Sequence, residues 1–382
     1  MYNRNLGSLH PALFLQTYSN DSSHLFVKLP AGDLLYQKSA TAFESRFWIW
    51  YGIYPNIESS QLLDSATYNF TDVSTNTQQE LTIPIKIKTP ARKNYLMHVK
   101  VFDLNRGKFA ERNIDVVNNS SQSANTFALY HIENKFVPVL DNFLLANKSY
   151  FISNNIEPEK QLYIRYFKDD FPVAAVPFKT NGFVKFSYAA DSTYLLTNRK
   201  QELHFDKFGM YHFQFDTTLK EGYTAYFFNN DYPSINKLEQ MTEPLRYLFT
   251  NEEYTKLMKA DDTKKAVDDF WLQCAGNEER ASKLVSAYYN RVQKANEYFV
   301  SFTQGWKTDR GMVYIIFGAP EVVYKSNNTE MWEYQSDGND ELRFTFKKIN
   351  NPFSENDFQL IRSVSYEVNW YRAVEKWRAG RL

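Results

Sequence analysis

The chain has 382 residues, and 44 lysines and arginines stand against 44 aspartates and glutamates, so its formal net charge is zero. A protein that binds nucleic acid or an anionic membrane surface needs an excess of cations on one face, so this balance argues against both functions. Hydrophobic residues make up 43% and charged residues 23%, which is typical of a globular protein, and the length favours two or three domains. A single cysteine, Cys274, excludes an internal disulfide.

The sequence contains no apolar run of about 18 residues or more, so it predicts no membrane-spanning segment. Residues 1–11 lack the basic and apolar regions of a secretory signal. Two expectations about the location remain. Either the protein is exported and its leader is missing from this sequence, or it is cytoplasmic and Met1 is the native start.

The first part of the chain alternates between short apolar or aromatic runs and turn residues, a pattern that predicts strands. The predicted strands are Ala12–Tyr18, His24–Leu29, Leu34–Gln37, Arg46–Tyr54, Leu81–Ile87, Tyr95–Asp103 and Ala110–Val117. Pro84 indicates that its strand is an edge strand or a bulged one. About seven strands in about a hundred residues are typical of an antiparallel sandwich. We therefore expect an Ig-like β-sandwich over residues 1–118.

A polar stretch at Asn118–Ser123 is the best candidate for a linker. The β-pattern then resumes and continues to about residue 230. Its predicted strands are Thr126–His131, Gln161–Phe167, Gly182–Tyr188, Tyr194–Thr197, Met210–Phe215 and Tyr223–Phe228. We expect a second sandwich-like module over residues 119–230.

From residue 231 the apolar period changes from 2 to 3.6, which predicts helices. Thr250 with Glu253 forms a capping box, and Asn277 is an N-cap candidate for a long amphipathic helix that ends near Phe299. The remaining predicted elements are a helix at Thr263–Cys274, strands at Met312–Phe317, Glu330–Gln335 and Leu342–Phe346, and a C-terminal segment, Val364–Trp377, that starts as a strand and finishes as a helix. We expect an α+β domain over residues 231–382.

The segment after the long helix reads Gly-Trp-Lys-Thr-Asp-Arg-Gly from Gly305 to Gly311. It resembles the signature of the GWxTD domain, which is found chiefly in Bacteroidota. The positions that carry the resemblance are Gly305, Trp306, Thr308, Asp309, Arg310, Gly311, Gly318 and Trp332. The family has no assigned activity, and the resemblance implies an exported or lipid-anchored protein of the cell envelope.

The residue types of the motif suit a turn that specifies the fold. Gly305 allows a positive φ where the chain leaves the long helix. Trp306 offers a large apolar anchor, while Thr308 and Asp309 suit the acceptance of backbone N–H bonds, and Gly311 completes the turn. We expect a mainly structural role; the alternative is a binding or catalytic site.

Catalytic chemistry near the motif would depend on carboxylates. A hydrolase needs two carboxylates at a defined separation, or a nucleophile oriented by a base, and nothing in the sequence fixes such a pair. The carboxylates of this region are Asp309, Glu321, Glu330 and Glu333. All six histidines precede residue 213, so the C-terminal domain has no imidazole to act as base or metal ligand. We predict no catalytic residue, no metal and no cofactor.

A second candidate site lies in the strand Arg46–Tyr54. Alternation places Phe47, Ile49, Tyr51 and Ile53 on one face of this strand and Trp48, Trp50 and Tyr54 on the other. One face must be core, so the other is a candidate binding surface for a glycan or a protein partner. The alternative is that the tryptophans lie under a neighbouring domain or loop.

Three short segments, Asp64–Ala66, Asp191–Thr193 and Asp216–Thr218, resemble the O-glycosylation sequon that Bacteroidota apply to exported proteins. With the family resemblance, they lead us to expect a periplasmic or outer-membrane-associated protein. We expect a non-catalytic binding or scaffolding component of the cell envelope with protein partners. The alternatives are a hydrolase that acts on an envelope polymer through acidic residues near Asp309, and a cytoplasmic adaptor.

Overall fold

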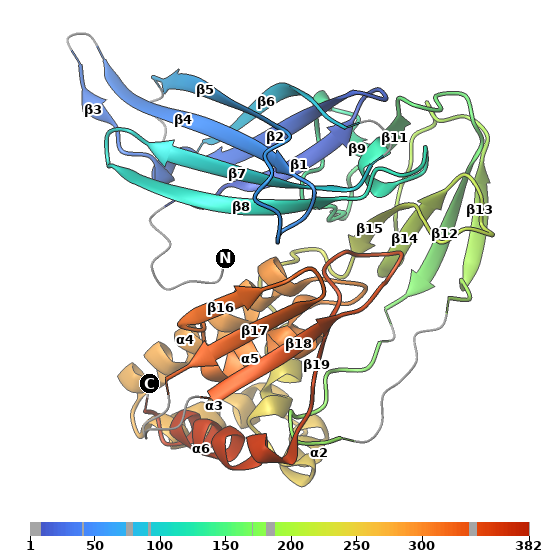
Figure 1. Ribbon diagram of the computed structural model, residues 1–382. Helices are drawn as coiled ribbons and strands as arrows, with labels where there is room; N and C mark the ends of the chain where they lie inside the picture. The colour runs from blue at the N-terminus through green and yellow to red at the C-terminus, as the bar shows by residue number, and fades with distance from the viewer. Residues whose placement is uncertain are drawn as a thin grey trace. The chain divides into compact units, whose positions relative to one another are not determined.

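The computed structural model describes residues 9–39, 42–73, 79–90, 93–169, 171–180, 188–335 and 342–381. These residues form mostly antiparallel sheets followed by a helical C-terminal region (Figure 1). The chain gathers into two compact units: Met1–Lys168 with Ala189–Phe227, and Asp169–Tyr188 with Phe228–Leu382. The domain boundaries expected after residues 118 and 230 stay predictions.

The first part of unit one contains two antiparallel sheets. One sheet has the order β1-β2-β6 and is formed by Ala12–Thr17, Ser22–Pro30 and Glu80–Lys88. The other has the order β3-β4-β7-β8, with β5 also paired to β4, and is formed by Gln37–Lys38, Phe43–Tyr54, Asp64–Asp72, Tyr95–Asp103 and Lys108–Val116. β6, which contains Pro84, lies at an edge of its sheet, so the edge-strand prediction is confirmed.

The two sheets share one apolar core, because alternate residues of each strand point to the same side. Leu25 of β2, Ile49 of β4 and Met97 of β7 are fully buried in it. Strand β5 was not predicted. Its side chains alternate between half-buried and exposed, and Ala66, Tyr68 and Phe70 pack against the core, so the strand period of 2 is present in this sequence.

The rest of unit one adds two further antiparallel sheets. Their orders are β10-β9-β11 and β13-β12-β14-β15. The strands are β9 Phe127–His131, β10 Asn134–Pro138, β11 Tyr150–Asn154, β12 Leu162–Lys168, β13 Ser192–Leu196, β14 Gly209–Gln214 and β15 Tyr223–Phe227. Phe127, Ile164 and Phe213 belong to a core that both sheets share. Of the strand predicted at Gly182–Tyr188, residues 182–187 lie outside the described residues.

The stretch expected as a linker is packed rather than exposed. Gln122 and Ser123 are buried, and the Gln122 side-chain oxygen accepts hydrogen bonds from the backbone N–H groups of Phe215 (3.0 Å) and Asp216 (3.2 Å). The polar composition of this stretch therefore serves internal hydrogen bonds as well as a turn.

Unit two contains the helices. They are α1 Leu238–Thr242, α2 Asn251–Met258, α3 Thr263–Ala275, α4 Glu278–Phe299, α5 Asp309–Phe317 and α6 Glu367–Arg378. Thr250 and Glu253 form the predicted capping box of α2, and Asn277 caps α4 as predicted, because its side chain accepts from the backbone N–H of Arg280. Helix α3 ends at Gly276, which has a φ of 79°.

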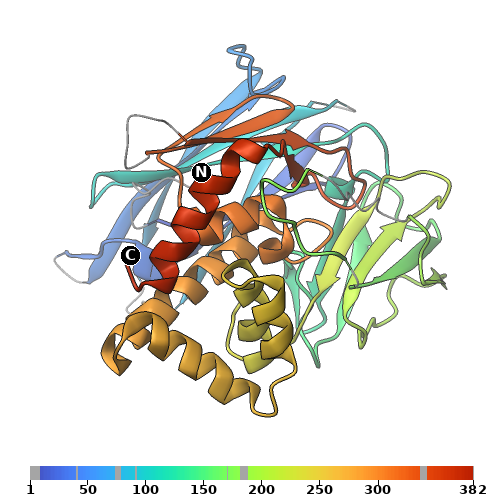
Figure 2. The ribbon, with the colours of Figure 1, turned by 90° about the horizontal axis from the view of Figure 1, so that it is seen from below.

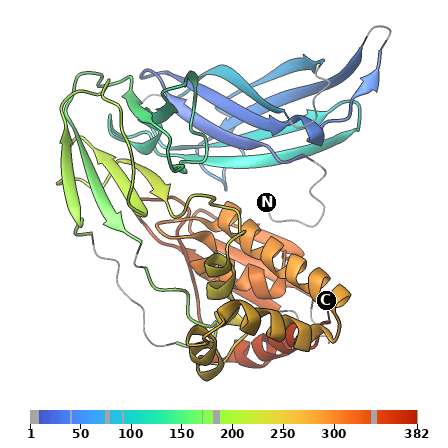
Figure 3. The same ribbon diagram turned by 180° about the vertical axis from the view of Figure 1, so that it is seen from behind.

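One four-stranded antiparallel sheet accompanies these helices, with the order β16-β17-β18-β19. Its strands are Val322–Lys325, Thr329–Tyr334, Leu342–Lys348 and Phe358–Leu360. Helices α4 and α5 cover one face of this sheet (Figures 1 and 3), where Phe299 packs against Trp332 and Phe317 against Phe344. Helix α6 packs against α3 and α5 (Figure 2).

Two predictions for this unit were wrong. The apolar run Met312–Phe317 is helix α5 and not a strand. Helix α5 is buried on all sides, so its sequence is apolar at nearly every position and shows no period. A strand that is buried on both faces has the same sequence pattern, so the pattern does not distinguish the two. The C-terminal segment begins with a 3-10 turn at Val364–Tyr366 instead of a strand.

Among the helices of the described ranges, none has the length and apolar character that a bilayer crossing requires.

Candidate functional site

The motif Gly305–Gly311 joins α4 to α5. Gly305–Lys307 form a 3-10 turn, and Thr308 is the N-cap of α5. The Thr308 hydroxyl accepts from the N–H of Gly311 (3.1 Å) and donates to the carbonyl of Gly305 (2.8 Å). One side chain thus closes the turn and starts the helix.

The two glycines of the motif permit close backbone contact. A Cβ on Gly305 would lie 2.0 Å from the carbonyl oxygen of Ala295 in α4, and a Cβ on Gly311 would lie 1.9 Å from the carbonyl oxygen of Gly305. Gly305 does not have the positive φ that we expected. It is required for a different reason, because any side chain there would push the turn away from α4.

Trp306 is 2% exposed and anchors the turn. Its backbone N–H donates to the side-chain oxygen of Asn296 (3.1 Å), and its carbonyl accepts from the Tyr247 hydroxyl (2.9 Å). The indole N–H donates to the side-chain oxygen of Gln304 (3.0 Å). Its polar groups are therefore hydrogen-bonded while the ring is buried.

Asp309 connects the start of α5 to the end of β19. Its Oδ2 accepts from the backbone N–H of Leu360 (2.8 Å) and from Nη1 of Arg362 (3.0 Å), and its Oδ1 accepts from Nη2 of Arg362. The side chains of Asp309 and Arg362 are 9% and 6% exposed. The carboxylate is thus held in a bidentate, buried ion pair.

Arg310 and Glu330 form a second buried ion pair, in which Nη1 lies 3.3 Å from Oε2 and each side chain is 2% exposed. Arg310 also donates to the carbonyl of Asn356 (2.8 Å), and its guanidinium lies 4.1 Å from the ring centre of Phe358. Oε1 of Glu330 accepts from the indole N–H of Trp332 (2.6 Å). The cluster joins α5 to β17 and to the segment before β19.

Gly318 ends α5 with a φ of 84°. Next to it, Nη1 of Arg291 donates to the carbonyls of Ile315 (3.1 Å) and Ile316 (3.0 Å), so it satisfies two carbonyls at the end of the helix. The Gly318 carbonyl accepts from the Tyr334 hydroxyl (2.9 Å). Both ends of α5 are therefore fixed by side chains of other elements or of the motif.

The sequence reasoning missed the partners of the motif. Arg362, Asn356 and Arg291 lie on other segments, and no local pattern around them indicates their role. In the described ranges, no group of three or more His, Cys, Asp or Glu side chains is placed to hold a metal ion.

The second candidate, Trp48, Trp50 and Tyr54, lies on the face of β4 opposite the core, and all three side chains are partly buried. Trp48 stacks on Phe102 of β7, with ring centres 4.9 Å apart, and Phe102 stacks on Phe109 of β8 at 6.5 Å. The three rings belong to directly paired residues of neighbouring strands and stack on one another. Their edges, and not their faces, therefore point away from the sheet.

Trp50 is arranged differently, because its ring lies over Gly52. A Cβ on Gly52 would lie 2.5 Å from the outer ring of Trp50, so the glycine makes room for the indole. The ring also meets His98 of β7 edge-on at 5.8 Å. The structure thus brings Trp48 and Trp50 together with Phe102, Phe109 and His98, which sequence reasoning had not included.

Residues 209–379 match the model of the GWxTD domain. The chain contains a GWxTD domain over residues 209–379. The match begins at Gly209, the first residue of β14, and ends at Ala379, just after α6, so it starts before residue 231, where the α+β domain was expected to begin. A comparison with curated proteins gives no match. Within the GWxTD domain, the signature residues form the junction of α4, α5 and the sheet.

Proposed function

We propose that the protein is a non-catalytic binding or scaffolding component of the bacterial cell envelope. The observation that carries this proposal is the state of Asp309. Its carboxylate is buried, paired with Arg362 and bonded to the main chain at Leu360. A carboxylate that acts on a substrate must reach it or reach an attacking water, and this one is occupied by protein groups.

The same reasoning gives little support to a hydrolase built around Asp309. Glu330 is paired with Arg310 at 3.3 Å, and Glu333 lies 3.1 Å from Arg343. Inverting and retaining hydrolases need a carboxylic acid and a second carboxylate on either side of a substrate. Since Asp309, Glu330 and Glu333 each form an ion pair with an arginine, these carboxylates support a structural role instead.

We further propose that the chain consists of two Ig-like sandwich modules, residues 1–118 and 119–230, followed by the α+β domain of residues 231–382. The two shared cores of unit one support this division, since each joins a pair of antiparallel sheets. Modules of this kind commonly present surfaces to partners, which is an analogy at the level of the fold.

The GWxTD domain has an exposed apolar stripe that suits a protein partner. Val364, Val368 and Tyr371, on the turn before α6 and on its first half, are 70%, 64% and 51% exposed. Val368 and Tyr371 are three residues apart and lie on one side of α6, and Val364 lies in the turn that leads into it. Contiguous exposed apolar surface is typical of an interaction site.

We propose a periplasmic or outer-membrane-associated location. The family resemblance supports it, and so do the sequon-like segments, since Ser65 and Thr217 are exposed. N-terminal sequencing and fractionation of the native protein test this proposal. A cytoplasmic protein that begins at Met1 would contradict it.

Affinity capture from the cell envelope fraction, followed by mass spectrometry, tests the binding function. We expect the wild type to retain specific proteins and the double variant Val364→Asp/Val368→Asp to lose them. Met258→Asp, on a residue of α2 that is 51% exposed, is the matched control and should behave as the wild type. Identical capture by the wild type and the stripe variant would contradict the role of the stripe.

A further inference from the structure

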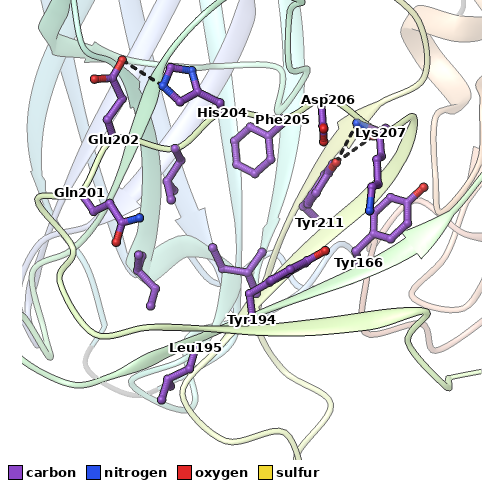
Figure 4. A pocket seen from close by; sticks show the side chains of 13 residues that line it. Tyr166, Tyr194, Leu195, Gln201, Glu202, His204, Phe205, Asp206, Lys207 and Tyr211 are labelled. Atoms are coloured by element: carbon purple, nitrogen blue, oxygen red, sulfur yellow. Dashed lines mark hydrogen bonds and ion pairs between the residues drawn. The ribbon is translucent and has the colours of Figure 1, made fainter.

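A pocket of about 540 Å³ lies in unit one, beside strands β12 to β14 and the segment 201–207 (Figure 4). Pockets that bind small molecules have volumes of about 300–1,000 Å³, so this one is of suitable size for a ligand. All of its lining residues belong to the sheet β13-β12-β14-β15 or to the segment 201–207.

The floor of the pocket is aromatic and rigid. The ring centre of Tyr211 lies 4.5 Å from that of Phe205 and 5.2 Å from that of Tyr166. The hydroxyls of Tyr211 and Tyr166 donate to the carbonyls of Lys207 and Phe208, each at 2.8 Å. Because these hydroxyls already bind the backbone and both tyrosines are buried, the floor offers a ligand ring surface rather than polar groups, chiefly the ring of the half-buried Phe205.

The ring of Tyr194 from the edge strand β13 adds an exposed aromatic surface (Figure 4). This side chain is 49% exposed, and its hydroxyl accepts from the Ser192 hydroxyl at 3.2 Å. An aromatic ring held in place but open to solvent can stack against a flat apolar face.

The rim of the pocket is polar. Within the described part of the chain, the side chains of Gln201 and Asp206 form no hydrogen bond or ion pair. Oε1 of Glu202 lies 3.4 Å from Nε2 of His204, and the Lys207 ammonium lies 5.8 Å from the ring centre of Tyr166. The rim therefore presents hydrogen-bond acceptors and donors close together, above an apolar floor.

We infer that this pocket binds a neutral saccharide, as a short oligosaccharide or the end of a glycan chain. A pyranose ring has a flat apolar face that stacks on aromatic rings and a rim of hydroxyls that both donate and accept hydrogen bonds. Tyr194 and the floor match the face, and Gln201, Glu202 and Asp206 match the hydroxyls.

Other ligand classes fit the pocket less well. An anionic ligand would be repelled by Glu202 and Asp206. A cationic ligand would meet the Lys207 ammonium, which already faces the ring of Tyr166. An acyl chain would cover the polar rim without giving it hydrogen bonds, which costs free energy.

Isothermal titration of the full chain with maltotriose, cellotriose, mannotriose and chitotriose tests the inference, with trilysine and dodecanoate as probes of the other classes. We expect saturable binding of at least one saccharide. Tyr194→Ala should weaken this binding about tenfold, whereas Tyr194→Phe should retain it, because the ring and not the hydroxyl makes the contact. Asp206→Asn should also weaken it.

The matched control is Phe136→Ala, which removes an aromatic side chain of the same unit that is 89% exposed and outside the pocket. It should bind as the wild type does. The inference is independent of the partner-binding role of the helical unit, so Val364→Asp/Val368→Asp should also bind normally. Failure of every saccharide to bind, binding that Tyr194→Ala leaves unchanged, or binding of trilysine or dodecanoate in their place would overturn it.

Discussion

Gly311 packs directly against the carbonyl of Gly305, so closely that a Cβ on Gly311 would lie 1.9 Å from that oxygen. Gly305 in turn lies against the backbone of Ala295 in α4. The two glycines thus hold the start of α5 against the turn and the turn against α4. This contact explains why the motif begins and ends with glycine.

Replacement of Gly311 by alanine should destabilise the helical unit by about 3 kcal/mol, because the new methyl group overlaps a backbone atom that cannot rotate away. Urea unfolding followed by far-UV circular dichroism measures this. Gly276→Ala is the control, since its Cβ would meet nothing within 4 Å and only its φ of 79° opposes a side chain. The free energy of unfolding of Gly276→Ala should be lower than that of the wild type by about 1 kcal/mol. Equal losses for the two variants would argue against the close contact.

Trp306→Ala should lower the free energy of unfolding by about 3–5 kcal/mol, the usual loss for a buried aromatic residue. The ring is 2% exposed, and its removal leaves a cavity beside Tyr247. Tyr324→Ala, which truncates a side chain that is 51% exposed, should change stability by less than about 0.5 kcal/mol. A Trp306→Ala protein as stable as the wild type would show that the indole is not an anchor.

His212 predicts a pH dependence for unit one. Burial lowers the pKa of His212 from 6.5 to about 3, and its ring nitrogens lie 2.9 Å from the Thr224 hydroxyl and 3.2 Å from the Lys220 carbonyl. Between these two pKa values the unfolded chain binds a proton that the folded chain does not. The free energy of unfolding should therefore fall by about 1.4 kcal/mol for each pH unit from about pH 6.5 down to about pH 3.

Urea unfolding of the wild type and of His212→Gln between pH 7 and pH 4 checks this prediction. The variant should lack this part of the slope, even if it is less stable at neutral pH. If both proteins lose stability equally as the pH falls, His212 is protonated in the folded state and the prediction is wrong.

The sequence predicts those elements whose ends are marked by neighbouring residues, such as the capped helices. Asn277 and Thr250 indicated helix starts because their caps are formed by neighbouring residues. The apolar run Met312–Phe317 predicts a strand as readily as a helix, because a segment buried on every side has no period. The motif itself indicates Trp306, Thr308 and Asp309, but no local signal indicates Arg362, which lies 53 residues beyond its partner Asp309. Such pairs follow only from the tertiary fold.

The ion pair of Asp309 and Arg362 carries the central claim that the GWxTD signature shapes the fold. Since one side chain is 9% and the other 6% exposed, removal of one charge leaves the other buried without its partner. Asp309→Asn should therefore destabilise the protein by about 3–5 kcal/mol. This exceeds the loss of a helix cap, a role that belongs to Thr308.

The most direct measurement is the thermal melting of Asp309→Asn beside the wild type. The control is Asp268→Asn, which removes a carboxylate of α3 whose side chain is 65% exposed. We predict that Asp309→Asn lowers Tm by about 10 °C and that the control leaves Tm unchanged. An unchanged Tm for Asp309→Asn, together with loss of the protein's function in the cell, would contradict the structural role and favour a chemical one.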